Sequence, residues 1–176
     1  MCFIALMAAV LCVIAPFSLP IGPVPISLAA FAVYLAGALL GCGQGTAAVA
    51  LYLVIGAVGV PVFAGWSAGC SNLIGPTGGY LFGYLPCAAI VGFGISRWGG
   101  REAHLFNSSF FPAYPLSMVI GTLVLYALGT AWFMMQLHYT FASALAVCVL
   151  PFLPGDALKI AAASVLAPIL RKRLFL

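Results

Sequence analysis

The sequence predicts an all-α integral membrane protein, and three observations support this fold class. Hydrophobic residues make up 65% of the 176 residues and charged residues only 5%, whereas about a quarter of an ordinary soluble domain is charged. Gly and Pro, rather than charged residues, divide the chain into successive apolar runs. The chain is long enough for several membrane crossings of roughly 20 residues each. We therefore expect a single transmembrane domain over residues 1–176.

Six of the apolar runs are expected to cross the membrane as helices. Gly and Pro are commoner in membrane helices than in soluble ones, so their presence within a run does not argue against a helix. The expected spans are residues 2–18, 26–41, 44–60, 78–97, 113–136 and 154–171. Two further segments are apolar without obviously spanning the membrane: residues 60–77, which are rich in Gly and Pro, and residues 139–153, which have the length of a short interfacial or re-entrant helix.

The basic residues predict which side of the membrane each end faces. If the N-terminus is cytoplasmic, six crossings place the loop of residues 98–112 and the C-terminus on the cytoplasmic side as well. These regions and the adjoining helix ends contain five of the six bases, namely Arg97, Arg101, Arg171, Lys172 and Arg173. This distribution follows the positive-inside rule. The same bases are too few and too terminal for a nucleic-acid-binding surface.

Asp156 and Lys159 form the most informative pair in the chain. They lie three residues apart between two apolar runs, so on a helix they share one face. A helix N-terminus stabilises a carboxylate but repels an ammonium group, so Lys159 requires a partner, either Asp156 or a ligand. Ionisable residues at membrane depth are usually functional. The alternative is a solvated ion pair at a helix end, with the lysine extended to water.

Residues 61–80, expected on the outer side between the third and fourth spans, form an irregular segment with the composition of a binding site. Such backbone cannot face lipid, so it must pack on protein or line a cavity. Glycine allows close backbone approach, an Asn amide offers donors and an acceptor, and aromatic rings supply apolar walls. The candidate contact residues are Asn72, Gly78, Gly79, Tyr80 and Trp66. Plain connection and an aromatic membrane belt are the alternative interpretations.

Catalytic, metal and nucleotide sites are not predicted. The sequence has no GxxxxGK[ST] motif. Its six cysteines form no CxxC pair and have no His or acid at metal-ligand spacing, so we expect packed thiols and no metal site. The two acids, Glu102 and Asp156, fall on opposite sides of the membrane in this topology, and His104 and His138 lie near span ends without a nucleophile at suggestive spacing. We therefore expect a protein that is not an enzyme and that has no cofactor of its own.

Two motifs in this order, Gly75-Pro76-Thr77-Gly78-Gly79-Tyr80 and Pro154-Gly155-Asp156-x-x-Lys159, carry a resemblance that extends over nearly the whole chain. The sequence resembles the biotin-specific S-components (BioY family) of energy-coupling-factor (ECF) transporters, which are bacterial cell-membrane proteins. The resemblance implies high-affinity biotin capture from the extracellular side, with Asn72, Asp156 and Lys159 holding the ureido ring. We expect the valerate carboxylate to reach backbone N–H groups of residues 61–80, and residues 20–25 to act as a lid.

The resemblance also implies partners. S-components associate with a transmembrane coupling protein and two cytoplasmic ATPases, which would use the ATP. Alanines of the first helix form part of that contact, and Ala5 and Ala9 match the pattern. Small residues at this spacing let another helix approach closely. Two alternatives remain open, namely an S-component for another vitamin and a structural subunit of a membrane complex.

Overall fold

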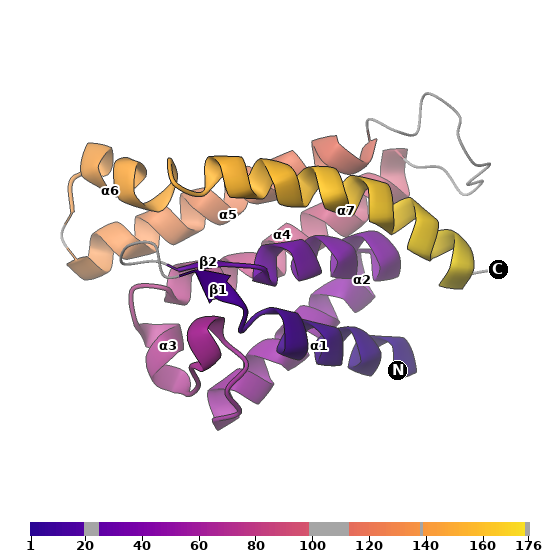
Figure 1. Cartoon of the computed structure of the whole chain (residues 1–176), viewed down its shortest axis with the longest axis horizontal. Coiled ribbons are helices and arrows are strands. Elements are labelled where there is room, and N and C mark those ends of the chain that lie inside the picture. Colours follow the sequence, from indigo (N-terminus) through magenta and orange to yellow (C-terminus); the bar gives the residue numbers. More distant parts are fainter. Residues whose placement is uncertain (20–24, 99–112, 138, 175–176) are drawn as a thin grey trace.

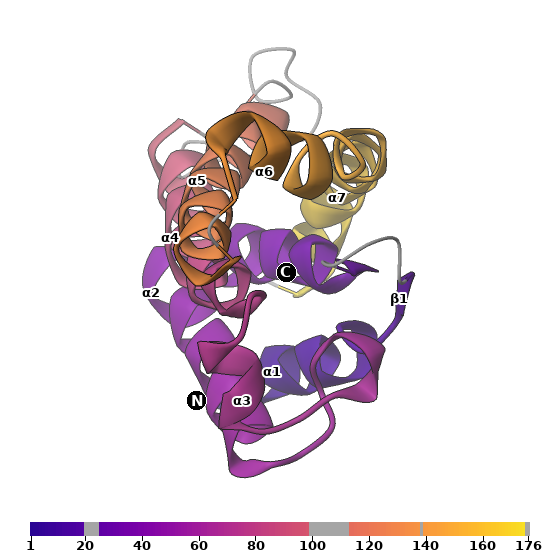
Figure 2. The same ribbon diagram turned by 90° about the vertical axis from the view of Figure 1, so that its left-hand side faces the viewer.

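Helices make up most of the computed structural model, which describes residues 1–19, 25–98, 113–137 and 139–174. The helices are α1 (Cys2–Ile14), α2 (Ala29–Val58), α3 (Cys70–Ile74), α4 (Gly78–Trp98), α5 (Ala113–Leu137), α6 (Phe141–Cys148) and α7 (Leu153–Leu174), with a short 3-10 helix, η1 (Ala64–Trp66). A two-stranded antiparallel sheet pairs β1 (Ser18–Leu19) with β2 (Ile26–Ser27). In Figures 1 and 2, α5, α6 and α7 lie above and α1 and α3 lie below; α4 and the start of α2 lie between them, and the end of α2 runs down beside α3. The predicted all-α class is confirmed.

Helix α2 reverses direction at Gly41 instead of running straight. Gly41 has a φ of 79° and a ψ of −177°, a conformation that glycine adopts without a steric penalty. A Cβ atom on Gly45 would lie 2.7 Å from the carbonyl oxygen of Ala36, yet nine residues of straight helix rise about 13.5 Å. The helix is therefore a hairpin, as Figure 1 shows. Its two limbs correspond to the expected spans 26–41 and 44–60.

Backbone contacts hold this hairpin against α4. A Cβ atom on Gly37 would lie 2.6 Å from the carbonyl oxygen of Ala88, and Gly92 lies directly against the backbone of Cys42. Small residues are typical of such close helix contacts in membranes, where packing rather than the hydrophobic effect drives helix association.

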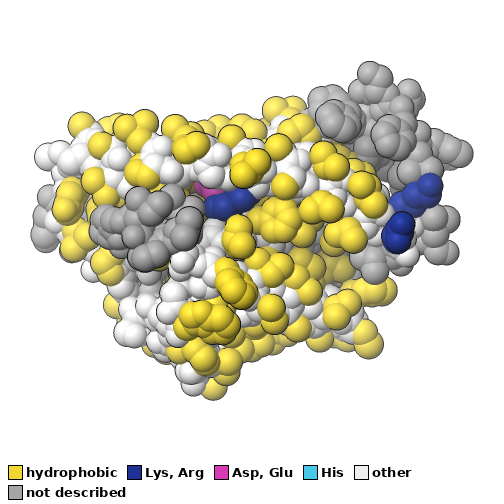
Figure 3. Space-filling view, in the orientation of Figure 1, with side chains coloured by type: hydrophobic (Ala, Val, Ile, Leu, Met, Phe, Trp, Pro, Cys, Tyr) yellow, Lys and Arg dark blue, Asp and Glu magenta, His cyan; other side chains and the backbone are white. Residues whose placement is uncertain are grey.

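Four described helical segments are long and apolar enough to cross a membrane, namely Ala29–Val58, Gly78–Arg97, Ala113–Leu137 and Leu153–Arg173. The six expected crossings are therefore not confirmed by length alone. The difference arises because the hairpin counts as one helix and because α1 has only 13 residues. Helix α1 ends before Pro16, which cannot continue the backbone hydrogen-bond ladder. Figure 3 shows hydrophobic side chains over much of the visible face, as expected for contact with lipid.

The segment between α2 and α4 is more ordered than predicted, because it contains η1 and α3. Its backbone bonds to other parts of the chain, with Gly69 N–H donating to the carbonyl of Gly56 at 2.8 Å and Gly65 N–H to that of Pro16 at 3.0 Å. Residues 139–153 contain α6, a short helix as expected. Several sequence-based expectations lie outside the described residues, namely those on residues 20–24 of the lid, Arg101, Glu102, His104 and His138.

Candidate ligand-binding site

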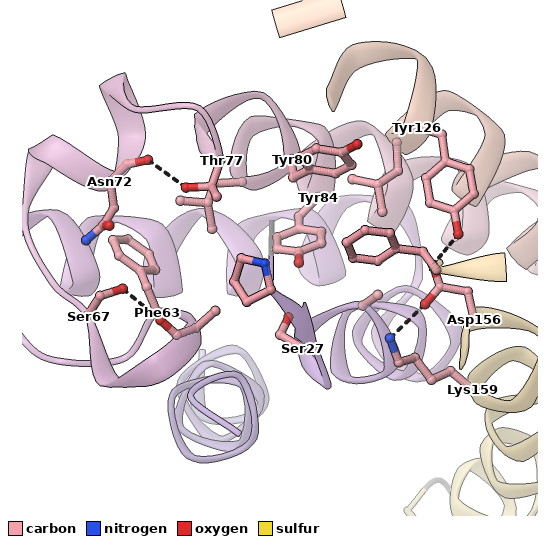
Figure 4. A pocket seen from close by; sticks show the side chains of 16 residues that line it. Ser27, Phe63, Ser67, Asn72, Thr77, Tyr80, Tyr84, Tyr126, Asp156 and Lys159 are labelled. Atoms are coloured by element: carbon pink, nitrogen blue, oxygen red, sulfur yellow. Dashed lines mark hydrogen bonds and ion pairs between the residues drawn. The ribbon is translucent and has the colours of Figure 1, made fainter. Parts of the chain in front are cut away.

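A pocket of about 230 Å³ lies among α2, α4, α5, α7 and the segment that precedes α4. Its polar lining residues are Ser27, Ser67, Asn72, Thr77, Tyr80, Tyr84, Tyr126, Asp156 and Lys159. Its apolar lining residues are Pro25, Ala30, Phe63, Ala64, Leu81, Leu125 and Phe152. Figure 4 shows these side chains strung along an elongated space, with polar groups at both ends.

One end of the pocket, here called the ion-pair end, is formed by Asp156, Lys159 and Tyr126. Lys159 Nζ lies 2.7 Å from Asp156 Oδ1, and the two residues are only 8% and 5% exposed. Both belong to the first turns of α7 and share one face, as their spacing predicts. Of the two partners that the sequence leaves open for Lys159, Asp156 or a ligand, the structure shows the pair with Asp156. The burial of both residues argues against the solvated-pair alternative.

Tyr126 joins this pair from a different helix, α5. Its hydroxyl donates to Asp156 Oδ2 at 2.5 Å, since a carboxylate can only accept. The sequence alone did not identify Tyr126, because it lies 30 residues from Asp156 and is one of seven tyrosines in the chain. A buried tyrosine hydroxyl usually requires a hydrogen-bond partner, but this rule applies to every tyrosine and does not single out Tyr126.

The other end, here called the amide end, is formed by Asn72, Ser67 and Thr77. Asn72 Nδ2 donates to the carbonyl of Ala68 at 2.9 Å, and Ser67 Oγ donates to that of Ala64 at 2.8 Å. Figure 4 shows Asn72 at the far end of the pocket from Asp156 and Lys159. The structure therefore does not bring Asn72 and the ion pair to one point. A ligand that touches both must extend along the pocket.

Aromatic side chains form the walls between the two ends. Tyr80, a predicted site residue, lines the pocket and stacks on Phe152 with a centroid distance of 6.4 Å and an interplanar angle of 14°. Its hydroxyl donates to the carbonyl of Cys148 at 3.2 Å. Phe63 and Tyr84 extend the aromatic lining. An apolar body with a few polar groups is typical of sites for small organic molecules.

Three predicted site residues, Gly78, Gly79 and Trp66, do not line this pocket. A Cβ atom on Gly78 would collide with the carbonyl of Leu73, and one on Gly79 would collide with Trp132. These glycines therefore allow α4 to pack closely against α3 and α5. Trp66 is 60% exposed. The sequence analysis expects these glycines to let a ligand approach the backbone, whereas the close neighbours in the structure are the Leu73 backbone and the Trp132 side chain.

Ala5 and Ala9, the predicted partner-binding residues, are exposed on α1. Ala8 and Leu11 on the same helix are buried against the rest of the protein. Ala5 and Ala9 therefore lie on the outer face of α1, and no residue of α1 lines the pocket.

Comparison with known proteins identifies the family. The sequence matches the BioY family over residues 1–175. The biotin transporter BioY of Thermotoga maritima is 38% identical over 155 residues, which cover 88% of this chain and 85% of that protein. The probable biotin transporter BioY of Pyrococcus horikoshii is 36% identical, covering 93% of this chain and 91% of that protein. The crystal structure of the S-component for biotin from an ECF-type ABC transporter matches with a TM-score of 0.84 and 28% identity, over 97% of this chain and 89% of that one. These relatives are transport proteins rather than enzymes, and this chain belongs to the BioY family.

Proposed function

We propose that this chain is the membrane-embedded biotin-binding subunit of an ECF-type vitamin-uptake transporter. The observation that carries the proposal is the elongated pocket with a buried ion pair at one end and aromatic walls along its length. The names of the relatives, biotin transporters and an S-component for biotin, support the identity of the ligand.

The ion-pair end suits the ureido ring of biotin. A cyclic urea is neutral and presents two N–H donors and a carbonyl acceptor. The Asp156 carboxylate accepts from one N–H, and the Lys159 ammonium donates to the carbonyl. The two N–H bonds diverge across the ring, so a single carboxylate takes only one of them. Because Asp156 and Lys159 neutralise each other, a neutral ring fits here without burying an unpaired charge.

The rest of biotin extends along the aromatic walls toward the amide end. Its sulfur-containing ring and aliphatic chain contact apolar surface there, and the valerate carboxylate reaches the amide end. An Asn amide has two N–H bonds, of which Asn72 uses one on Ala68. The other N–H, together with backbone N–H groups of the segment before α4, is available to the carboxylate. In this arrangement Asn72 recognises the carboxylate rather than the ureido ring.

We also propose six membrane crossings, formed by α1, the two limbs of α2, α4, α5 and α7. Figure 1 places both termini and the end of α4 at one end of the bundle, with α3 and the start of α7 toward the other. Arg97, Arg171, Lys172 and Arg173 all belong to the first of these ends. The positive-inside rule then makes both termini cytoplasmic and opens the pocket to the extracellular side of a bacterial plasma membrane.

This orientation can be tested with the chain's own cysteines. Cys70 in α3 and Cys42 at the turn of α2 are both exposed. Single-cysteine variants in intact cells should react with a membrane-impermeant maleimide at Cys70 but not at Cys42. Labelling of Cys42 alone would reverse the proposed orientation.

Transport requires partners in this proposal, namely a transmembrane coupling protein and two cytoplasmic ATPases. The exposed Ala5 and Ala9 supply a surface that another helix can approach closely. Ala9→Trp should reduce co-purification of the coupling protein while leaving biotin binding intact. Val119→Trp is the matched control, because Val119 is 43% exposed on α5. Equal loss in both variants would contradict a specific role for α1.

Isothermal titration of the detergent-purified protein tests the function directly. Biotin should bind at micromolar concentration or below, and thiamine and riboflavin should not. Binding of another vitamin in place of biotin would support a different S-component. A structural subunit would bind none of them.

A further inference from the structure

The hydrogen bond between Tyr126 and Asp156 joins α5 to α7 at the ion-pair end. Its length is 2.5 Å, and Tyr126 is 8% exposed. Hydrogen bonds from a hydroxyl to an ionised carboxylate are short and about twice as strong as neutral ones. Figure 4 shows the two side chains pointing toward each other across the end of the pocket.

This bond restrains the carboxylate from a second helix, whereas the ion pair lies within α7. The terminal torsion of an Asp side chain is broad, so the carboxylate plane turns easily when one oxygen is unrestrained. Lys159 holds Oδ1 from the same helix, and its long flexible stem can follow such a turn. Tyr126 holds Oδ2 from a second helix, through a rigid ring with only two side-chain torsions.

We infer that Tyr126 is a positioning residue that fixes the Asp156 carboxylate so that its free acceptor positions face the ureido ring. The inference rests on the proposed function. A carboxylate has about four acceptor positions, and the bonds to Lys159 and Tyr126 occupy two of them. Because the two bonds use different oxygens, each oxygen keeps capacity for a ligand donor. Tyr126 therefore acts on biotin through Asp156.

The test is a double-mutant cycle on biotin affinity with Tyr126→Phe and Asp156→Asn. Alone, Tyr126→Phe should weaken binding about 10- to 100-fold, because a misplaced Asp156 carboxylate loses its own hydrogen bond to the ureido ring, and that is a bond to a charged group. Combined with Asp156→Asn, it should weaken binding by less than about threefold more, because contacting residues are not additive. Equal factors in the two backgrounds would overturn the inference.

Tyr34→Phe is the matched control. It removes the same hydroxyl from a fully buried tyrosine, bonded at 2.6 Å to Thr122 across α2 and α5, and Tyr34 does not line the pocket. We expect it to change biotin affinity by less than about twofold in either background, because its hydroxyl bonds Thr122 and shares no hydrogen-bond partner with Asp156. A loss comparable to that of Tyr126→Phe would mean that helix packing, not carboxylate orientation, sets the affinity.

Two further measurements separate positioning from mere support of the fold. Biotinamide differs from biotin only at the valerate carboxylate, so Tyr126→Phe should weaken the binding of both ligands by the same factor. Tyr126→Gln, which keeps a donor for Asp156, should bind biotin several-fold more tightly than Tyr126→Leu, which has none. A loss confined to biotin, or equal affinities for the Gln and Leu variants, would contradict the inference. Failure of the wild-type protein to bind biotin would refute the proposed function instead.

Discussion

The two ends of the pocket hold their polar side chains in different ways. At the ion-pair end, each hydrogen bond joins two side chains, and one of them joins two helices. At the amide end, Asn72, Ser67 and Thr77 each donate to a backbone carbonyl no more than five residues away. The first arrangement depends on how α5 and α7 pack. The second depends only on the local course of the chain before α4.

This difference indicates a division of roles within one site. Buried side-chain networks are rigid and costly to leave half satisfied, so the ion-pair end should set affinity and selectivity for the ligand's polar head. Polar groups bonded only to neighbouring backbone move with their own segment. The amide end should therefore contribute less and adapt more readily to the ligand's tail.

The largest loss of biotin affinity is expected from a substitution that breaks the ion pair. Asp156→Asn leaves Lys159 buried without its partner and should weaken biotin binding by about 2 to 5 kcal/mol. Titration of the purified variant measures the loss. Ser164→Ala is a suitable control, because Ser164 is also buried on α7 but outside the pocket lining. Unchanged biotin affinity in Asp156→Asn would refute the proposed site and favour a structural subunit.

The next largest effect is a loss of stability, expected from a substitution that disturbs the helix contacts supporting the amide end. Gly79→Ala forces its methyl group against Trp132, whose indole N–H donates to the carbonyl of Gly75 at 3.0 Å. We expect a loss of about 1 to 3 kcal/mol in the free energy of unfolding, visible as a lower melting temperature in detergent. Gly43→Ala, with open space at its Cβ position, should be neutral or slightly stabilising. Similar melting temperatures for the two variants would contradict the packing role of Gly79.

A smaller effect sharpens the assignment of the amide end. Asn72→Ala should weaken biotin binding by about 0.5 to 1.5 kcal/mol, because Asn72 is only half-buried and water can replace much of its bond to the carboxylate. The loss should be smaller for biotinamide, which lacks the carboxylate. Asp156→Asn, by contrast, should weaken both ligands equally. The reverse pattern would place the carboxylate at the ion-pair end.

The smallest effect concerns Trp66, which lies beyond the pocket. Trp66→Ala should change biotin affinity by no more than about 0.5 kcal/mol, as is usual for exposed positions. A competition assay against labelled biotin resolves such a difference. A tenfold loss would show that the ligand contacts η1 as well.

The sequence predicted what depends on neighbouring residues and missed what depends on packing. The shared helix face of Asp156 and Lys159 follows from their spacing alone, and both limbs of α2 follow from the apolar runs 26–41 and 44–60, which meet beside Gly41. Tyr126 could not be chosen, because its role depends on the contact between α5 and α7.

The glycines show a second limit of sequence-based prediction. Glycine at positions 78 and 79 indicates that something approaches the backbone closely, but the residue type does not say whether that is a ligand or another helix. In the structure, the neighbours are Leu73 and Trp132. The same ambiguity explains why Trp66 was assigned to the pocket, since an interfacial tryptophan suits a ligand wall and a membrane belt equally.

The spacing of the ion pair has a consequence for biogenesis. Since Asp156 and Lys159 lie within one turn of α7, their charges can neutralise each other as soon as that turn forms, before α7 meets any other helix. A nascent α7 can then enter the bilayer as a locally neutral segment, at lower cost than a span with one isolated charge. Moving the lysine by two positions along α7, about half a helical turn, would keep both charges but place them on different faces of the helix. This change should lower the yield of inserted protein.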